Sequence, residues 1–486
     1  MKRILTLLLV FVLTVSLIAC SQAPVETTPP TTTTTAPKAE TLVGFGKGDI
    51  TATWPIGLQG YGNEATRISE GIKTYIYIMC VAITDTNGET VLLMSIDAGG
   101  GGFHTTVRPL IEEEFGIPQE NVMLSAIHQH STPVGGKEYK ELIMQGTRTA
   151  VKQALKDQAP ATMYINTVTT EALSFVRNYV CNDGSFYGPN YGSAASGIAG
   201  HESDSDKEMR LIKFDRGEEK KPIIMVNFQA HPHMGAGSAD RNQHADWPGI
   251  MRETLEEELD CHAMYLSGAG GNLNSNSAIS EENISTDWKD HGKRAAQYVI
   301  NAEDSYTQVE IGTLQIVHET NAYANNHSKD YLYEEALELH NLRSKDFSAA
   351  VAAVANANPE IHSIYHASAI VSQKKAGETR NLTIGVIALG DVAFTLHPYE
   401  MFDTNGMELR AGTVGNENYL PEDQLENPYA MTFVCTLANG HLGYIPSRLG
   451  YTNGGYSTDI AYLEPGSGEV LVGDYLRILN SLYENK

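Results

Sequence analysis

Short hydrophobic runs alternate along much of this chain with stretches in which apolar residues recur every three or four positions. The runs predict strands near residues 74–83, 90–97, 121–128, 209–214, 222–231 and 263–268. The amphipathic stretches predict helices over 105–115, 137–157, 248–259 and 287–302. Pro248 suits the first turn of the third helix, where a missing N–H costs nothing. Because strands and helices alternate, the pattern favours an α/β sandwich built on a mixed sheet.

The pattern changes in the second half of the chain. Helical periodicity runs from about residue 325 to 358 without intervening strands, which predicts a helical arm joining two parts of one domain. Strands are expected again at 366–373, 381–390 and 430–439. A closing helix is expected from about Glu469 to Tyr483.

The first 40 residues differ from the rest. Lys2 and Arg3 precede an apolar run of 16 residues that ends at Cys20, and this resembles a bacterial lipoprotein signal with cleavage before Cys20 and lipid on that cysteine. An ordinary signal peptide or a membrane anchor is the alternative, although the run is short for a span. Residues 21–40 are rich in threonine and proline and predict a disordered tether. We therefore expect an extracytoplasmic protein, anchored in the cell membrane through lipidated Cys20, whose globular part starts near Thr41.

The composition excludes some classes of protein. The 486 residues include 59 acidic and 34 basic side chains, which gives a formal net charge of −25. A nucleic-acid partner is excluded because it would need a cationic surface. The four cysteines beyond Cys20 are far apart and lack metal-binding spacing, so no disulfide can be assigned to them. We interpret them mostly as buried apolar residues: Cys80, Cys181, Cys261 and Cys435.

Residues able to bind a metal follow three of the hydrophobic runs. His128 and His130 are two positions apart at one strand end, where an extended chain places both on one face, and one of them should be the ligand. His231 and His233 repeat the arrangement after another strand. Glu400 follows a third run, where it could also be an acid in the first turn of a helix. A single such histidine pair would more often be structural, but two pairs at strand ends favour a zinc site.

Five ordered segments resemble the neutral/alkaline non-lysosomal ceramidase family. They are VGFGKGDITATWPIGLQGYG with SIDAGG around Asp97, NVMLSAIHQHSTPVGG, NFQAHPHMG with HADWPG around Asp246, TLHPYEMF, and ANGHLGYIPSRLGYTNGGYST. In the last segment, Tyr444 and Tyr456 are spaced as the family's two tyrosines are. The resemblance runs from about Val43 almost to the carboxyl end. It implies one catalytic domain over 41–486, with the helical arm inserted and without the C-terminal β-sandwich of full ceramidases.

The resemblance also implies one catalytic zinc ion. His128, His231, Glu400 and Tyr444 occupy the family's ligand positions. His441 is the alternative to Tyr444, because an isolated tyrosine is more often a core residue.

Other residues acquire expected roles from the same resemblance. His130 should lie beside the ligands and orient one of them or a transition-state oxygen. Arg177 should line the substrate pocket, with a surface ion pair as the alternative, and Tyr456 should be the second tyrosine of the site.

The sequence departs from the family where the family has a serine. In LSGAGGNLNSNS, Asn274 stands at the serine position and Asn272 at an aspartate position. An amide side chain cannot attack a carbonyl, and Ser275 or Ser277 could replace the serine only if the loop were shifted. We therefore expect attack by a water molecule that the zinc activates, with Asn274 at most a hydrogen-bond donor.

The resulting expectation is a zinc-dependent hydrolase that cleaves an N-acyl amide linkage, for example in a ceramide-like lipid. Zinc esterases use the same chemistry, so an ester or other carbonyl substrate is an alternative. A second alternative is a non-catalytic lipoprotein, such as a solute-binding protein, in which the histidines are structural. The expected partners are a small-molecule or lipid substrate and the membrane, and the oligomeric state is left open.

Overall fold

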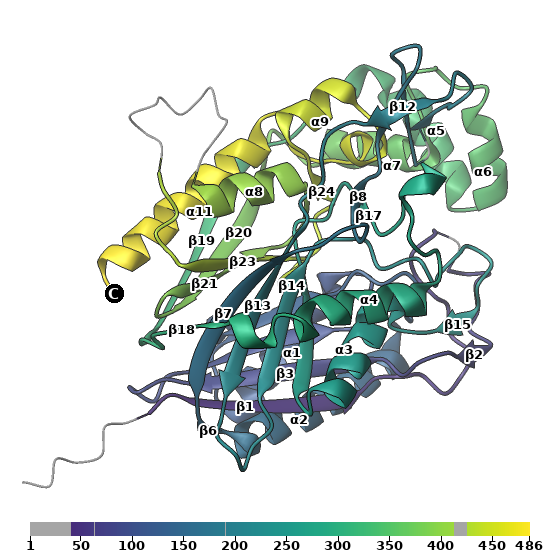
Figure 1. Ribbon diagram of the computed structural model, residues 1–486. Coiled ribbons are helices and arrows are strands. Elements are labelled where there is room, and N and C mark those ends of the chain that lie inside the picture. Colours follow the sequence, from purple (N-terminus) through teal and green to yellow (C-terminus); the bar gives the residue numbers. More distant parts are fainter. Residues whose placement is uncertain (1–39, 63, 190, 413–424) are drawn as a thin grey trace, which may run out of the picture. The chain divides into compact units, whose positions relative to one another are not determined.

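Three sheets form the body of the protein in the computed structural model, which describes residues 40–62, 64–189, 191–412 and 425–486 (Figure 1). In the first sheet the order is β5-β4-β3-β1-β6, in the second β16-β14-β13-β7-β18, and in the third β19-β20-β21-β23. Each contains one parallel pair among antiparallel ones: β4 with β5, β14 with β16, and β21 with β23. The sheets are therefore mixed, as the sequence predicts.

The strands of the first sheet are β1 (Leu42–Asp49), β3 (Tyr77–Thr84), β4 (Thr90–Ile96), β5 (Val122–Ala126) and β6 (Ala159–Pro160). The second sheet contains β7 (Thr162–Thr169), β13 (Glu208–Asp215), β14 (Ile223–Phe228), β16 (His262–Ser267) and β18 (Thr307–Val309). The third contains β19 (Leu314–Ala324), β20 (Thr379–Leu389), β21 (Val392–His397) and β23 (Met431–Thr436).

Shorter strands pair in the loops. They are β2 (Gly71–Ile72) with β15 (Asn242–Gln243), β8 (Phe175–Val176) with β17 (Leu273–Asn274), and β22 (Glu400–Met401) with β24 (Tyr444–Ile445). A small sheet contains β9 (Tyr179–Cys181), β10 (Phe186–Gly188), β11 (Tyr191–Gly192) and β12 (Ile198–His201).

Helices cover the outer faces of the three sheets. The first sheet packs against α1 (His104–Phe115) and α2 (Lys137–Asp157), the second against α3 (Asp246–Glu258) and α4 (Trp288–Ile300), and the third against α8 (Asp403–Ala411) and α11 (Ser467–Glu484). The remaining helices are α5 (Tyr333–Arg343), α6 (Phe347–Val354), α7 (Ile364–Lys375), α9 (Arg448–Asn453) and α10 (Tyr456–Asp459). Figure 1 shows α11 running along the third sheet.

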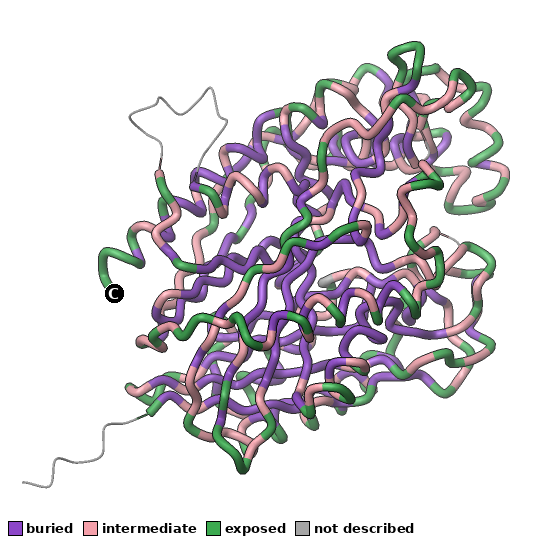
Figure 2. Tube along the Cα trace, in the orientation of Figure 1, coloured by how far each residue is buried: buried purple, intermediate pink, exposed green. Residues whose placement is uncertain are grey.

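The central core lies where the inner faces of the sheets meet. It contains Phe45 from the first sheet, Phe214 and Met225 from the second, and Phe394 and Phe433 from the third, all buried. Figure 2 shows that burial follows the strands, whereas exposure is concentrated in loops and outer helix faces. Burial of apolar surface from all three sheets in one core holds their strand ends in fixed relative positions. The predicted mixed-sheet α/β sandwich is confirmed.

The strand predicted at 366–373 is wrong, because this segment lies in α7. Ala367, Ile370 and Val371 are spaced as one face of a helix and pack in the same cluster as α5. The Ser363 side chain caps the helix by accepting a hydrogen bond from the backbone N–H of His366. The helical arm therefore continues to Lys375, beyond the boundary that the sequence predicts.

Two further expectations concern the cysteines and the chain start. Cys80, Cys181, Cys261 and Cys435 are all buried and free, which confirms their interpretation as apolar core residues. The predicted signal segment and tether, residues 1–40, fall almost entirely outside the described residues. Within the described part, no helix combines the length and apolarity that crossing a membrane requires.

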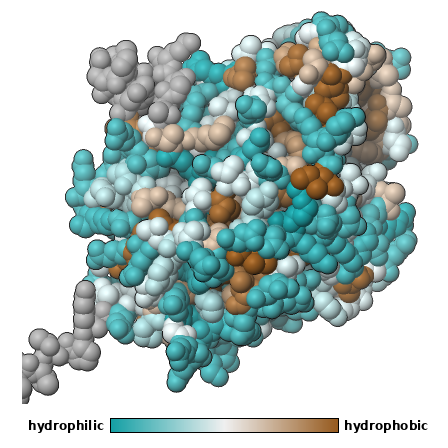
Figure 3. Space-filling view, in the orientation of Figure 1, coloured by the Kyte–Doolittle hydropathy of each residue, from teal (hydrophilic) through white to brown (hydrophobic). Residues whose placement is uncertain are grey.

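Figure 3 shows a mostly hydrophilic face, on which several hydrophobic side chains lie over the region of β12 and the arm.

Candidate metal centre

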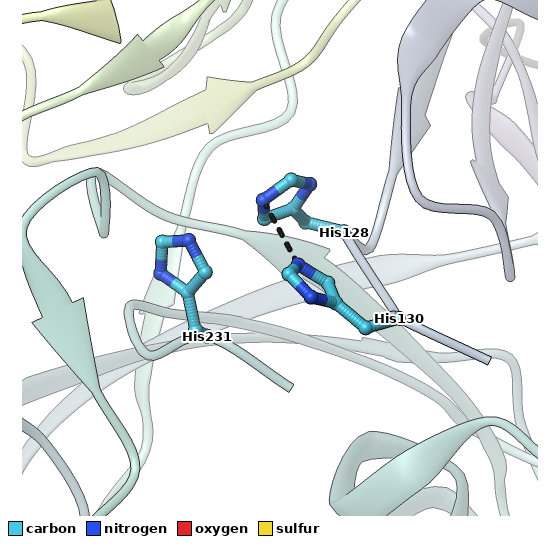
Figure 4. A group of neighbouring side chains, drawn as sticks. All are labelled: His128, His130 and His231. Carbon is cyan, nitrogen blue, oxygen red and sulfur yellow. Dashed lines mark hydrogen bonds between the residues drawn. The ribbon is translucent and has the colours of Figure 1, made fainter. Parts of the chain in front are cut away.

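Loops that follow strands of all three sheets meet at one place. His128 follows β5, His231 follows β14, and Glu400 lies in β22 shortly after β21. Tyr444, which follows β23, lies opposite Glu400 because β24 pairs in parallel with β22. The imidazole rings of His128 and His231 have centroids 4.8 Å apart, and Figure 4 shows them converging with the ring of His130. Side chains that are 272 positions apart in the chain, from His128 to Glu400, thus share one site.

Three donor atoms face one another in this site. Glu400 Oε2 lies 3.1 Å from His128 Nε2 and 3.3 Å from His231 Nε2. The other ring nitrogens point at carbonyl oxygens: His128 Nδ1 is 2.5 Å from Gly99 O and His231 Nδ1 is 2.8 Å from Leu273 O. A carbonyl only accepts, so each Nδ1 carries the hydrogen and donates it. In the neutral form of each ring, Nε2 then directs its lone pair inward, the arrangement that metal-binding histidines adopt.

The charge of the site also suits a cation. Burial, and then Arg177, lower the pKa of His231 to about 3, so this imidazole is neutral. Burial alone would raise the pKa of Glu400, but the neighbouring His128 brings it well below its usual range. Glu400 Oε2 is buried and makes no well-formed hydrogen bond. Burial would lower the pKa of His128, but the neighbouring Glu400 raises it, so a zinc ion would replace a proton at this ring. A buried, ionised oxygen without a hydrogen bond, facing two imidazole nitrogens, fits the donor set of zinc.

The backbone at His128 differs from the extended segment that the sequence predicts. The strand ends at Ala126, and His128 has a φ of 64°, a left-handed conformation that is uncommon for a residue other than glycine. The chain therefore turns at His128 instead of presenting both histidines from a regular strand. Strain of this kind persists only where surrounding contacts impose it, and it concentrates at functional sites.

Arg67 is a residue of this site that the sequence does not reveal. Its guanidinium is 1% exposed and donates to the backbone carbonyls of Gln59, His130 and Asp240 and to Ser131 Oγ, at 2.7 to 2.9 Å. It thereby fixes the strained turn that follows His128. Arg67 belongs to no motif, because a lone arginine in sequence carries no sign of where its hydrogen bonds will go.

His130 and His441 lie at the edge of the donor group. His130 Nε2 is 3.4 Å from His128 Nε2, and its Nδ1 is buried without a hydrogen-bond partner. Gly60 passes so close that a Cβ there would lie 2.6 Å from the Cβ of His130. His441 Nε2 is 3.4 Å from Glu400 Oε1, the outer oxygen, and its side chain is 39% exposed. The structure brings both residues to the site, His130 on the inner side and His441 on the open side.

Tyr444 and Tyr456 line the adjoining pocket, and Arg177 is buried next to them and is not among the residues that line it. The guanidinium of Arg177 is buried, with Nη1 3.3 Å from His231 Nε2 and Nη2 donating to Gly271 O and Ser457 Oγ. Its Cζ lies 5.4 Å from the ring centroid of Tyr444 and 5.9 Å from that of Tyr456. Arg177 is therefore not part of a surface ion pair. Burial, followed by the charge of Glu400, raises the pKa of Tyr444 well above its usual value.

Asn272 and Asn274, which stand where the family has an aspartate and a serine, make different contacts. Asn272 and Asp403 form a reciprocal pair, in which Asn272 Nδ2 donates to Asp403 Oδ1 at 2.7 Å and the backbone N–H of Asp403 donates to Asn272 Oδ1 at 2.9 Å. Asn274 Oδ1 lies 3.1 Å from His233 Nε2. The backbone of Asn274 forms a bridge with His231. Asn272 thus anchors the loop to the start of α8, and Asn274 lies beside a metal-site residue.

Both neighbouring serines are buried and face away from the donor group. Ser275 Oγ donates to the backbone carbonyl of His231 at 2.7 Å. Ser277 Oγ lies 3.3 Å from His201 Nε2 and accepts a hydrogen bond from the backbone N–H of Ile279. Neither hydroxyl lines the pocket that contains Glu400.

A pocket of about 410 Å³ opens next to the donor atoms. His128, His130 and Glu400 form its floor, together with His441. The walls include Arg343 and Tyr365 from the helical arm and Tyr444, Tyr456 and Tyr462 from the C-terminal segment. The pocket therefore joins a candidate metal site to a wall of aromatic side chains and one arginine.

Comparisons with known proteins agree with these motifs. Residues 41–264 match the family described as neutral/alkaline non-lysosomal ceramidase, N-terminal. The neutral ceramidases of Drosophila melanogaster and Drosophila pseudoobscura pseudoobscura are 25% and 24% identical to this chain over 248 residues. Each match covers 46% of this chain and 33% of the relative, so the chain matches about a third of the length of these curated relatives.

Solved structures share the fold over a longer part of the chain. The crystal structure of neutral ceramidase from Pseudomonas aeruginosa matches with a TM-score of 0.68 at 15% identity, covering 92% of this chain and 75% of that one. A structure described as ceramidase complexed with C2 matches with a TM-score of 0.66 at 15% identity. The family match contains His128, His130, Arg177 and His231, and the fold match extends over most of the chain. This chain is therefore a distant relative of the neutral/alkaline non-lysosomal ceramidases, as its motifs predict.

Proposed function

We propose that this protein is a zinc-dependent hydrolase of the neutral ceramidase type, which cleaves an N-acyl amide linkage. The observation that carries the proposal is the buried Glu400 Oε2, which faces His128 Nε2 and His231 Nε2 without a well-formed hydrogen bond. Tyr444, opposite Glu400 in β24, is the proposed fourth ligand. Zinc held by these residues would polarise the amide carbonyl and activate a water molecule.

The surrounding side chains supply the rest of the chemistry. Arg177 carries a buried positive charge next to His231, where it can stabilise negative charge that develops on the carbonyl oxygen. His130 lines the pocket, and its Nε2, 3.4 Å from His128 Nε2, can form a hydrogen bond with the attacking water. Tyr456 forms the wall beside Tyr444, with ring centroids 6.2 Å apart. These groups are positioned before substrate arrives, so they need little reorganisation during the reaction.

The relatives named as ceramidases favour a lipid substrate with an N-acyl chain. The pocket supports such a substrate because aromatic walls suit an acyl chain or its attached base, whereas the polar floor suits the amide. An ester would meet the same groups, so a zinc esterase is the second candidate.

A substrate panel with and without chelator tests the proposal. The full-length protein should release fatty acid from at least one N-acyl lipid, lose this activity with a zinc chelator, and recover it when zinc is restored. Faster cleavage of matched esters than amides would favour the esterase. A protein that binds no zinc would contradict both and favour a solute-binding role.

Replacing either serine should leave most of the activity. Ser275→Ala removes a hydroxyl that donates to His231 O, and Ser277→Ala removes one that lies near His201 Nε2. Neither hydroxyl faces Glu400. Loss of a true nucleophile costs several powers of ten, so the rates separate the mechanisms. Asn274→Ala should fall between, with about a 100- to 1000-fold loss if its amide donates to the transition state. A folded, zinc-loaded Ser275→Ala protein without activity would instead identify Ser275 as the nucleophile.

We also propose that the protein is a lipoprotein, for which Cys20 after an apolar run is the supporting feature. Mass spectrometry of the native protein should identify a lipidated Cys20 as its first residue. Cys20→Ser should abolish the lipid and release the protein from membranes. An unmodified amino terminus elsewhere would contradict this location.

A further inference from the structure

We propose a second metal site, formed by His362, His366 and Asp459, that ties the helical arm to α10. His362 Nδ1 lies 2.8 Å from Asp459 Oδ2, and His366 Nδ1 lies 3.8 Å from Asp459 Oδ1. Candidate donor atoms of the three residues all lie within 4.8 Å of one another. The site shares no residue with the one around Glu400.

The contacts of His366 show which of its ring nitrogens lacks a hydrogen. The backbone N–H of His362 donates to His366 Nδ1 at 3.4 Å, so this nitrogen is an acceptor, and a metal ion would take its lone pair in place of that long hydrogen bond. The side chain of His366 is 4% exposed and that of Asp459 is 11% exposed, whereas that of His362 is 31% exposed. The site is therefore enclosed on the protein side and open to water on the other, which leaves room for water molecules to complete the coordination.

An ordinary ion pair does not account for the second histidine. The centroids of the two imidazole rings are 5.2 Å apart, and His366 Nδ1 lies 3.8 Å from Asp459 Oδ1, which is beyond hydrogen-bond distance. Within the described part of the chain, no lysine or arginine forms an ion pair with Asp459. By contrast, His327 and Asp330 of the same arm are 3.1 Å apart but include no second imidazole, and Lys374 neutralises Asp330 at 3.0 Å.

The donor set selects the class of metal. Two imidazole nitrogens with one carboxylate favour zinc or a similar transition-metal ion, whereas calcium and magnesium prefer oxygen ligands throughout. Zinc at this position would join two segments, since His366 lies in the first turn of α7, His362 lies just before that helix, and Asp459 ends α10.

This link acts on the pocket next to the first site. Tyr365 precedes His366, Tyr456 begins α10, and their ring centroids are 6.0 Å apart in the pocket wall. The Tyr365 hydroxyl also donates to the backbone carbonyl of Tyr61 at 3.1 Å. A metal ion between α7 and α10 would therefore hold both aromatic walls in place, and the arm would act as a metal-fixed side of the substrate pocket.

Zinc titration of the metal-stripped full-length protein tests the second site. Wild type should bind two equivalents of zinc, and the variant with both His362→Ala and His366→Ala should bind one. Asp459→Asn keeps the size of the side chain and should also lose one equivalent. His327→Ala is the matched control, because it removes a histidine from a lone His–Asp pair of the same arm, and it should still bind two.

The second site can be measured independently of the proposed activity. His231→Ala, which lacks a ligand of the first site, should retain one equivalent and should still gain thermal stability when zinc is added. Combining His231→Ala with Asp459→Asn should abolish that gain. A single equivalent in wild type that His231→Ala removes, or two in the folded His362→Ala, His366→Ala protein, would overturn the second site. A protein that carries zinc at both sites but hydrolyses no N-acyl lipid would instead count against the proposed function alone.

Discussion

Replacing His231 by alanine should remove the zinc of the first site and lower the hydrolysis rate by about 1000-fold or more. The metal supplies several kcal/mol of transition-state stabilisation, and each 1.4 kcal/mol corresponds to a factor of ten in rate. His128→Ala and Glu400→Gln should have the same effect, because each removes one of the three facing donor atoms. Glu400 Oε2 lies 3.1 Å from His128 Nε2 and 3.3 Å from His231 Nε2. Metal analysis by mass spectrometry and single-turnover kinetics on the full-length protein measure both quantities.

Two neighbouring histidines provide matched controls. His233 is two positions from His231 but lies against Asn274 Oδ1 at 3.1 Å, so His233→Ala should keep the zinc. His130→Ala should cost about 10- to 100-fold in activity or metal affinity, the usual effect of a residue that supports a ligand. One equivalent of zinc at the first site in each of the His128, His231 and Glu400 variants would show that these residues are not its ligands. This count is made in the Asp459→Asn background, so the second site does not contribute.

Arg252→Ala should destabilise the protein by about 3–5 kcal/mol, the usual cost of breaking a buried ion pair. Arg252 Nη1 and Nη2 donate to the two carboxylate oxygens of Asp97 at 2.7 and 2.8 Å, and the side chains are 6% and 0% exposed. Removing the arginine leaves a buried carboxylate whose other hydrogen bond comes from the backbone N–H of Tyr77. Urea denaturation at constant metal concentration measures the loss.

An exposed ion pair provides the comparison. Arg148 contacts Glu114 at 2.8 Å through a similar pair of nitrogens, but the two side chains are 38% and 35% exposed. Arg148→Ala should therefore cost much less stability than Arg252→Ala. Arg252→Met combined with Asp97→Leu should recover part of the stability, because it leaves no unpaired buried charge. Equal losses for Arg252→Ala and Arg148→Ala would mean that burial of the Asp97 pair does not matter.

The Asp97 pair also explains one motif residue. Asp97 belongs to the SIDAGG segment but does not contact the metal site. Its partner Arg252 lies on α3, so the pair joins the end of β4 to the second sheet's covering helix. Gly99, two positions later, accepts the hydrogen bond of His128 Nδ1. Asp97 thus supports the metal site indirectly, by holding the backbone near Gly99, whose carbonyl orients His128.

The sequence by itself determined most of the helices and strands and the strand ends that carry the candidate metal ligands. The spacing of apolar residues predicts α2 over 137–157 as the structure has it, and it locates the strands that precede His128 and His231. These features are local, since amphipathic periodicity reflects which face of a segment is buried. The exception is α7, where Ala367, Ile370 and Val371 also fit a short strand and only packing against α5 decides for the helix.

Tertiary structure alone decided which of these residues meet. Glu400 reaches His128 because β21 and β5 belong to different sheets whose inner faces share one core, and no local pattern encodes that packing. Arg67 at the turn after His128, and Asp459 beside His362 and His366, are likewise visible only once the chain has folded. The physical reason is that hydrogen bonds and metal ligands depend on distances of a few ångströms between residues far apart in sequence. Burial of the common core fixes those distances, and the sequence specifies that core only as a whole.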